Sequence, residues 1–249
     1  YEVMESGIGE LACKTSGSGR LPDIPVIIDA LESLLTPKDY AGEEVLVTAG
    51  PTQEPLDPVR YITNLSSGKM GYALATAACH RGARVTLISG PCALPAPPGV
   101  KMIGVRTALE MHEAVMKNVT KATVIIKAAA VADYRPESVS EEKIKKSKGL
   151  AAVRLVPNPD IIAELGSKKT AGILVGFAME TRELLANARL KLARKKMDMI
   201  VANSLREEGA GFGTDTNIVT IIDSNGKEIR LDKMTKSQVA HRILDHVKT

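Results

Sequence analysis

The chain has 249 residues, 44% of them hydrophobic, so it can bury the core of one large α/β domain or two small ones. A net charge of +4 and an aromatic content of 3% argue against nucleic acid as the main partner. No apolar run reaches the roughly 18 residues of a membrane span, and the start lacks the pattern of a signal peptide. We therefore expect a cytoplasmic protein without a membrane partner. Cys13, Cys79 and Cys92 lack CxxC spacing, which argues against a disulfide framework and a structural zinc site.

The N-terminal part differs in pattern from the rest. Residues 1–22 are rich in glycine and serine and show no hydrophobic periodicity. Residues 22–35, PDIPVIIDALESLL, repeat apolar side chains at helical spacing and predict a short amphipathic helix. The following stretch, TPKDYAGEE, reads as a linker. We therefore separate an N-terminal segment, 1–42, from a main domain, 43–249.

From Val45 onward, short runs rich in Val and Ile alternate with helical stretches. Such strands, apolar on both faces, are typical of a parallel sheet that helices cover on each side. The sequence therefore predicts a doubly wound, Rossmann-like α/β fold. The expected strands span 45–50, 84–90, 123–130, 172–178 and 199–203, and the expected helices span 69–82, 107–122, 159–166 and 182–197.

The C-terminal tail departs from this alternation. Two apolar runs, 217–223 and 227–231, flank Asn225-Gly226, a strong hairpin-turn signal. A helix over 235–247 follows, and Thr235 and Gln238 have the spacing of a capping box. The tail therefore predicts a β-hairpin extension of the sheet, closed by a helix.

Ligands of open parallel sheets bind beyond the carboxyl ends of the strands, so the loops to consider are 48–68, 127–136, 156–160 and 176–181. A nucleotide-dependent dehydrogenase would carry its glycine fingerprint directly after the first strand and an acidic residue at the end of the second. Here a long segment precedes the first helix, and the second strand ends in Ser89-Gly90. These departures leave the dehydrogenase as the weaker enzymatic alternative.

The stretch NLSSGKMG, 64–71, resembles a phosphate loop without being a Walker A loop. Thr63 stands where that loop has its first glycine, and Met70 stands where it has a Ser or Thr after the lysine. Ser66, Ser67 and Gly68 nevertheless lie where the first helix should begin, and the exposed N–H groups there form an anion site. Alternatively, Ser66 or Ser67 merely caps the helix.

The loop KAAAVADYRP, 127–136, lets a flat ligand approach the backbone, because three small alanines follow the strand. Asp133 either turns the chain or serves a ligand, through a metal ion or a base edge. Lys143 and Lys146 could meet a polyphosphate or simply form a solvated loop. Lys191 and Lys195, at i and i+4, share a helix face and could present two charges to one anion. Together these features indicate a nucleoside triphosphate held by its phosphates.

The motifs in 45–71, AAAVADYRP, EKIKK, NPDI, GFAMET and GFGTDTN resemble, in this order, the phosphopantothenate-cysteine ligase family, also called phosphopantothenoylcysteine synthetase. The resemblance runs from about Glu43 to the C-terminus. Residues 1–42 resemble the end of phosphopantothenoylcysteine decarboxylase, a flavin domain that bacteria often fuse ahead of the ligase. Cys13 matches the proton-donating cysteine of that family. The flavin-binding body is missing from this chain, so we expect neither FMN nor decarboxylase activity.

The resemblance implies a two-step ligation. 4'-Phosphopantothenate first reacts with CTP to give an acyl-cytidylate and pyrophosphate, and the amine of L-cysteine then displaces CMP. Mg²⁺ or Mn²⁺ and lysines neutralise the triphosphate. CTP rather than ATP is implied by the bacterial-type fusion tail alone. The family forms homodimers whose protomers share the substrate site, and the parent fusion is expected to be a larger homo-oligomer.

The resemblance also implies residue roles. Asn64 and Lys143 are the catalytic candidates, Asn64 at the acyl-phosphate and Lys143 at the triphosphate. Asp133 is the metal candidate. The substrate-binding candidates are Arg60, Asn64, Ala130 and Asn217. The CTP-binding candidates are Ser66, Gly68, Lys127, Ala128, Ala129, Asp133, Lys143, Lys146, Pro159, Asp160, Ile161, Ile162, Phe177, Lys191 and Lys195. A non-catalytic nucleotide-binding regulator remains the other alternative, since turnover does not follow from sequence.

Overall fold

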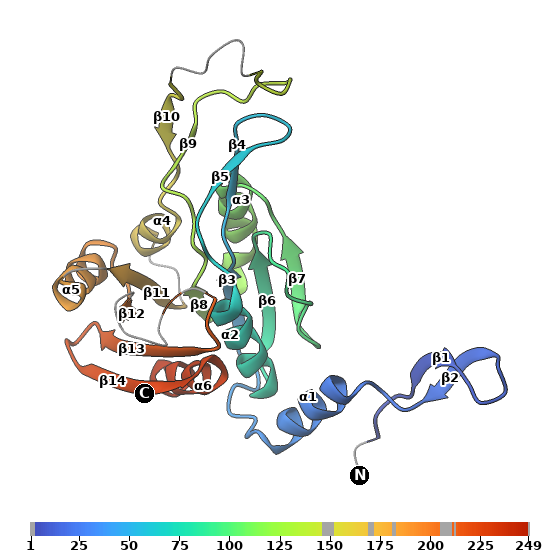
Figure 1. Ribbon diagram of the computed structural model, residues 1–249. Coiled ribbons are helices and arrows are strands. Elements are labelled where there is room, and N and C mark those ends of the chain that lie inside the picture. Colours follow the sequence, from blue (N-terminus) through green and yellow to red (C-terminus); the bar gives the residue numbers. More distant parts are fainter. Residues whose placement is uncertain are drawn as a thin grey trace.

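The computed structural model describes residues 3–145, 152–168, 172–180, 183–204, 211 and 213–248. Within them, an eight-stranded sheet forms the centre of the protein, in the order β14-β13-β12-β11-β8-β3-β6-β7 (Figure 1). Its strands are β3 (Glu44–Ala49), β6 (Arg84–Ser89), β7 (Lys101–Gly104), β8 (Val124–Lys127), β11 (Ile173–Glu180), β12 (Met199–Ser204), β13 (Thr216–Asp223) and β14 (Glu228–Thr235).

The strands from β12 to β7 are parallel to one another, and β13 and β14 extend the sheet antiparallel beyond β12. The chain starts the parallel part at β3, builds outward through β6 and β7, and returns to the other side of β3 with β8. The strand order therefore reverses between β3 and β8, which is the topological switch point of a Rossmann-like sheet. The predicted doubly wound fold and its C-terminal hairpin are confirmed.

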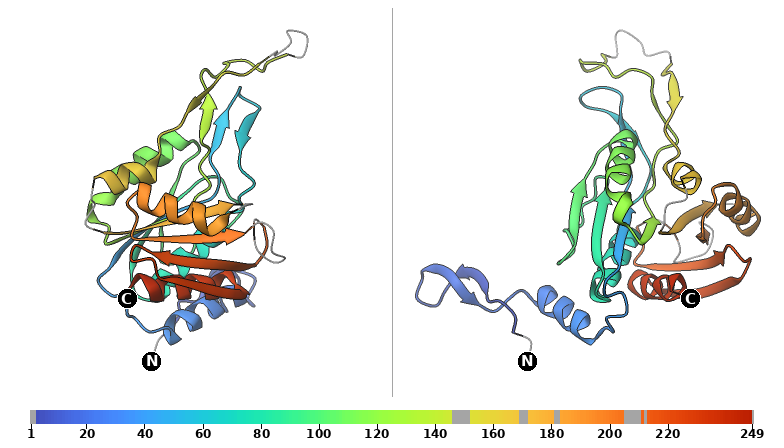
Figure 2. Two further views of the ribbon diagram at one scale, coloured as in Figure 1. Left: turned by 90° about the vertical axis from the view of Figure 1, so that its left-hand side faces the viewer. Right: turned by 180° about the vertical axis from the view of Figure 1, so that it is seen from behind.

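Helices cover both faces of the sheet (Figures 1 and 2). One face packs against α2 (Lys69–His80) and α6 (Lys236–Val247), and the other packs against α3 (Ala108–Asn118), α4 (Ile161–Ser167) and α5 (Leu184–Arg194). The predicted capping box is present at the start of α6, with Thr235 and Gln238 bonded reciprocally. A Cβ on Gly71 would lie 2.5 Å from the Cβ of Ala49, so this glycine lets the first turn of α2 rest on the end of β3.

The N-terminal segment projects from the body (Figure 1 and the right-hand view of Figure 2). The predicted helix is present as α1 (Ile24–Leu35), and no residue of it is buried. The preceding segment lacks periodicity but forms a hairpin of β1 (Gly7–Glu10) and β2 (Ser16–Arg20). None of the described helices combines the length and the apolar character that crossing a bilayer requires.

Two short antiparallel pairs rise from the carboxyl edge of the sheet, where the sequence predicts only loops. β4 (Gln53–Pro55) pairs with β5 (Tyr61–Thr63), and β9 (Tyr134–Pro136) pairs with β10 (Leu155–Pro157). Together with the segment 137–145 they form an extension that we call the arm, seen at the top of Figure 1. Residues 176–180 of the GFAMET motif are also strand rather than loop, because β11 pairs with β12 as far as Glu180.

Candidate functional site

The loops that follow β3 and β8 are joined by backbone hydrogen bonds at the switch point. Ala128 N donates to Thr48 O at 3.2 Å, and Ala130 N donates to Gly50 O at 2.9 Å. The hydroxyl of Thr52 accepts from Ala132 N at 3.0 Å. These bonds fix the backbone of the AAA motif, residues 128–130, beside the start of α2. We call these three alanines the AAA floor.

The start of α2 has no side-chain cap. Its N-cap is Gly68, whose φ of 77° is in the left-handed region that favours glycine. A Cβ at this position would lie 2.4 Å from Sγ of Cys92, so the close packing also requires glycine. Ser66 Oγ accepts from Gly68 N at 3.3 Å, and neither serine caps the helix. The alternative reading of Ser66 or Ser67 as a mere helix cap is therefore wrong.

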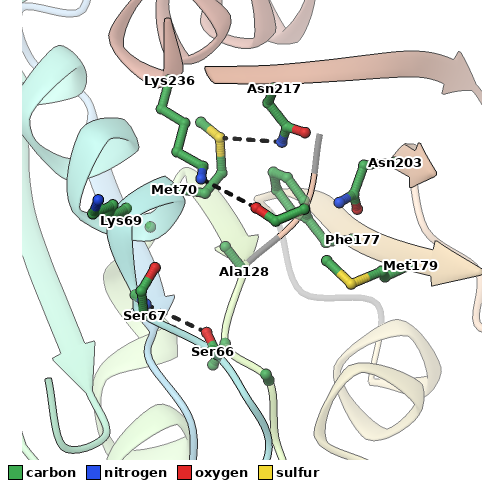
Figure 3. A pocket seen from close by; sticks show the side chains of 15 residues that line it. Ser66, Ser67, Lys69, Met70, Ala128, Phe177, Met179, Asn203, Asn217 and Lys236 are labelled. Atoms are coloured by element: carbon green, nitrogen blue, oxygen red, sulfur yellow. Dashed lines mark hydrogen bonds between the residues drawn. The ribbon is translucent and has the colours of Figure 1, made fainter. Parts of the chain in front are cut away.

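A cavity opens against this helix end, and we call it the switch-point cavity. Figure 3 shows Ser66 and Ser67 on one side of it and Phe177 and Asn203 on the other. Its position at the N-terminus of α2 favours an anionic ligand, because the first N–H groups of a helix lack intrahelical acceptors. The cavity is lined by residues 66–71, Ala128, Ala129, Ala130, Phe177, Met179, Asn203, Gly211, Asn217 and Lys236.

Two lysines hold the segment before β13 against the switch-point cavity. Lys236 is 7% exposed, and its ammonium donates to the carbonyl oxygens of Gly211, at 3.3 Å, and of Thr214. Lys69 Nζ donates to Gly213 O at 2.8 Å and pairs with Asp215 Oδ1 at 2.7 Å. Burial lowers the pKa of Lys236. Sequence reasoning missed both lysines, since each sits in an ordinary helix first turn.

A second cavity, which we call the α4 cavity, adjoins the first through Ala129 and Phe177. Its walls combine apolar side chains with a few charged ones. Lys195 Nζ pairs with Asp160 Oδ2 at 2.9 Å, and Asp160 Oδ1 also accepts from Ala163 N at 3.2 Å. The α4 cavity is lined by Lys127, Ala129, Val131, Ala132, Asp133, Asn158, Pro159, Asp160, Ile161, Ile162, Phe177 and Lys195.

Within the arm, the buried carboxylate of Asp57 links the turn between β4 and β5 to the segment 137–145. It accepts hydrogen bonds from Val59 N at 2.9 Å, from Arg60 Nε at 2.9 Å and from Ile144 N at 3.2 Å. Arg60 Nη2 donates in turn to Ile144 O at 2.8 Å. Asp57 and Arg60 thus hold both backbone groups of the residue that follows Lys143. The Arg60 guanidinium holds the pKa of the Asp57 carboxyl well below its usual range.

Replacing Asp57 by asparagine should loosen the arm without unfolding the sheet. The amide keeps its size but loses the charge and one acceptor, so Ile144 and its neighbour Lys143 lose their fixed position. We expect the ligation proposed below to slow by up to about 100-fold, the scale of a small misplacement remote from the chemistry. The measurement is kcat and KM beside the melting temperature. Full activity would show that Asp57 does not position the arm.

Protonation of Asp57 should act in the same direction as that substitution. Because the pKa of this carboxyl is lower in the folded than in the unfolded chain, its stabilising contribution is present above the unfolded pKa of about 3.9. The contribution is lost as the pH falls through the lower folded value.

The structure brings most of the predicted site residues to the two cavities. Ser66, Gly68, the backbone from Lys127 to Ala130, Phe177 and Asn217 line one or both. Asn64 lies at their edge, where its Nδ2 donates to Ala130 O at 3.0 Å. Asp133, Lys195 and residues 159–162 line the α4 cavity.

Three of the predicted site residues do not line either cavity. The lining of the two cavities includes neither Arg60 nor Lys143, which lie on the arm, and it does not include Lys191. Lys146 lies outside the described residues. Within one copy of the chain, the predicted anion site at the start of α2 is therefore separated from Lys143 on the arm. Figure 1 shows the arm extending away from β13 and β14.

The structure also shows where the metal candidate Asp133 and the expected proton donor Cys13 lie. Within the described residues, no group of three or more His, Cys, Asp or Glu side chains could hold a metal ion. Asp133 is exposed at the α4 cavity, which fits Mg²⁺ bound by one carboxylate and ligand phosphates. Cys13 is exposed between β1 and β2, and the nearby Thr15 hydroxyl lowers the pKa of its thiol.

Comparisons with known proteins agree with this architecture. Coenzyme A biosynthesis bifunctional protein CoaBC from Bacillus subtilis (strain 168) is 46% identical over 99% of this chain and 62% of its own length. The chain thus spans about three fifths of that relative. The crystal structure of the C-terminal domain of a CoaBC protein matches with a TM-score of 0.74 and 42% identity, covering 85% of this chain and 96% of that one.

A more distant solved structure shares the fold. It is a Cab2 variant in complex with phosphopantothenate-cysteine, with a TM-score of 0.67 and 19% identity over 91% of this chain and 93% of that one. The family described as DNA/pantothenate metabolism flavoprotein C-terminal domain has a model that matches residues 40–249. The chain therefore belongs to this family and is a homologue of the C-terminal domain of CoaBC proteins.

Proposed function

We propose that the domain 43–249 is a phosphopantothenate-cysteine ligase that uses CTP. The observation that carries the proposal is the uncapped N-terminus of α2 at the switch point, beside the α4 cavity, where Ile161, Ile162 and Phe177 lie among charged side chains. This arrangement supports an anion site beside a slot for a flat base. The CoaBC relative supports a role in coenzyme A biosynthesis, and the Cab2 complex supports the ligand class for this fold.

The proposed reaction activates a carboxylate that an amine cannot attack directly. A carboxylate oxygen of 4'-phosphopantothenate attacks the α-phosphorus of CTP, and pyrophosphate leaves. The amine nitrogen of L-cysteine then attacks the acyl carbon and loses a proton, and CMP leaves with the electron pair of the broken C–O bond. Both steps need the reacting groups held in line and the developing negative charge stabilised.

In this proposal, the residues of the two cavities hold different parts of the reactants. The N–H groups at the start of α2, with Ser66 and Gly68, hold a phosphate in the switch-point cavity. Asn64, Ala130 and Asn217 hold the acyl end, and the α4 cavity, with Lys195, takes the nucleoside. Mg²⁺ or Mn²⁺, held by Asp133 and the phosphates, supplies positive charge that neutralises the triphosphate.

Arg60 and Lys143 enter the site from a second copy of the chain in this proposal. The arm that carries them extends away from the cavities of its own copy, as Figure 1 shows. A twofold axis would let each arm cover the cavities of its partner, so each of the two sites would contain residues of both copies. The proposed protein is therefore a homodimer with shared sites.

Mixing two inactive variants tests the shared site. If Asn64 and Lys143 of one site come from different copies, a heterodimer of Asn64→Asp and Lys143→Gln contains one site with both original residues. Random reassociation should then recover about one quarter of the original activity, because half the dimers are mixed and each has one intact site. The measurement is the ligation rate after mixing and subunit exchange. No recovery, with heterodimers demonstrated by mass, would contradict the shared site.

A panel of nucleoside triphosphates tests the proposed function itself. With Mg²⁺ and 4'-phosphopantothenate, we expect pyrophosphate release from CTP that stops when the pantothenate substrate is omitted. A nucleotide-dependent dehydrogenase would release none, and a nucleotide-binding regulator would bind CTP without turnover. Residues 1–42 are assigned to the fused decarboxylase by resemblance alone, and we expect that they form no flavin pocket. FMN bound stoichiometrically to this chain would contradict that expectation.

A further inference from the structure

Lys127 has a side chain that the proposed mechanism does not use. It ends β8 and lies on the sheet face of Ile125, toward α4, where it lines the α4 cavity. Three other charged residues line this cavity: Asp133 from the loop after β8, Asp160 before α4, and Lys195 at the end of α5. The Lys127 ammonium therefore faces a small mixed set of charges.

The two carboxylates do not satisfy this ammonium. Asp160 is already engaged by Lys195 at 2.9 Å and by Ala163 N at 3.2 Å. Asp133 is exposed and makes no ion pair with Lys127 within 4.0 Å. Among the described residues, Lys127 donates no side-chain hydrogen bond and makes no ion pair. The cavity thus contains two ammoniums and two carboxylates, and one of the ammoniums, that of Lys127, has no hydrogen-bond or ion-pair partner among the described residues.

Burial without such a partner also shifts the pKa of Lys127. Burial lowers its pKa to about 8, and the attraction of Asp160 only partly opposes that effect. An ammonium that is partly removed from water without an acceptor is unfavourable, so such a group is expected to gain a partner when a ligand binds. The partner must offer a hydrogen-bond acceptor, since an ammonium only donates.

The position of the α4 cavity indicates which part of the ligand contacts Lys127. The phosphates are drawn to the N-terminus of α2 in the switch-point cavity. Ile161, Ile162 and Phe177 give the α4 cavity the apolar surfaces that suit the face of a base. The ring edge of cytosine carries acceptor atoms at O2 and N3, which match the donor of Lys127.

We propose that the Lys127 ammonium donates a hydrogen bond to an acceptor atom on the edge of the bound nucleobase. This inference rests on the proposed function, because it assigns a base contact within the same nucleotide site. It gives the side chain a role, whereas the family resemblance implies nucleotide recognition by the backbone from Lys127 to Ala129. The contact makes Lys127 a specificity residue.

Calorimetric binding to ligands that differ in their phosphates tests the proposal. Lys127→Met keeps the length of the side chain and removes the charge. We expect it to weaken the binding of CTP and of CMP by a similar factor, about tenfold or more, the scale of one charge-assisted hydrogen bond. Tripolyphosphate should bind both forms equally. Lys117→Met, at an exposed site on α3, is the matched control and should bind all three ligands as the unchanged chain does.

The other outcomes overturn the proposal in distinguishable ways. A loss confined to CTP and tripolyphosphate would make Lys127 a phosphate contact. Equal binding of CTP by the variant and the unchanged chain would leave the proposed function standing and remove Lys127 from the site. Absence of nucleotide binding by the unchanged chain would sink the proposed function as well. The melting temperature of Lys127→Met should be unchanged or higher, since an unpaired charge is removed; a marked decrease would indicate a structural role instead.

Discussion

Lys143→Gln is expected to slow the formation of the acyl-cytidylate by about 100-fold or more, the scale of losing one preorganised charge at the transition state. Lys143 is exposed on the arm, and the neighbouring Ile144 is held by Asp57 and Arg60. Glutamine keeps most of the side-chain length and can still donate a hydrogen bond, so the loss measures charge. The measurement is single-turnover release of pyrophosphate with excess enzyme.

Lys145→Gln provides the matched control for this variant. Lys145 is also exposed, two positions along the same segment, and we assign it no contact with the substrate. It should retain nearly the full rate. Equal rates for both variants and the unchanged chain would show that the lysines of EKIKK are a solvated surface, as the alternative reading of the sequence holds.

Asn64→Asp is expected to separate the two half-reactions. The amide of Asn64 donates to Ala130 O at 3.0 Å, so it sits beside the loop that forms the floor of the switch-point cavity. Aspartate keeps the size but removes this donor and places a negative charge beside an anionic mixed anhydride. We expect the variant to form acyl-cytidylate and pyrophosphate but to transfer the acyl group to cysteine about 100-fold more slowly.

Rapid-quench analysis measures this effect, because the intermediate should accumulate in the variant and not in the unchanged chain. Leu65→Ala, at a side chain 85% exposed, is the control and should show no accumulation. A variant that binds no CTP and forms no intermediate would place Asn64 in the phosphate site. The division of the NLSSGKMG loop into phosphate and acyl parts would then be wrong.

The sheet and its main helices were predictable because their patterns are local. β3, β8 and β12 are apolar on both faces, which is typical of parallel strands covered by helices. The Asn225-Gly226 turn likewise predicts the β13–β14 hairpin from a dipeptide. The strand order depends on contacts between distant segments. The expectation of a parallel sheet was nevertheless enough to predict a ligand at the carboxyl edge.

The arm could not be predicted, since contacts between distant segments hold it. β4, β5, β9 and β10 have three residues each, too few for a periodic pattern. Asp57 in the DPVR stretch looks like an ordinary turn residue, and its role depends on Ile144, which is far along the chain. A buried carboxylate with several donors is evident only once these segments are placed together.

The candidate site was predictable in its motifs and not in its supporting lysines. Ser66 and Gly68 follow from the expected start of a helix, and the AAA floor follows from the three alanines in the loop 127–136. Lys236 is an ordinary first-turn lysine in sequence, and only the fold shows that its ammonium holds two carbonyl groups at the switch-point cavity. The separation of Lys143 from that cavity is likewise a property of the fold.

The central claim is that the domain activates a carboxylate with CTP before cysteine takes part. The most direct test is to incubate the chain with CTP, Mg²⁺ and 4'-phosphopantothenate in the absence of cysteine, and then to add L-cysteine, identifying products by mass at both stages. We expect pyrophosphate and acyl-cytidylate in the first stage, and 4'-phosphopantothenoylcysteine with CMP in the second. Unchanged CTP at both stages, in a sample shown to be folded, would contradict it.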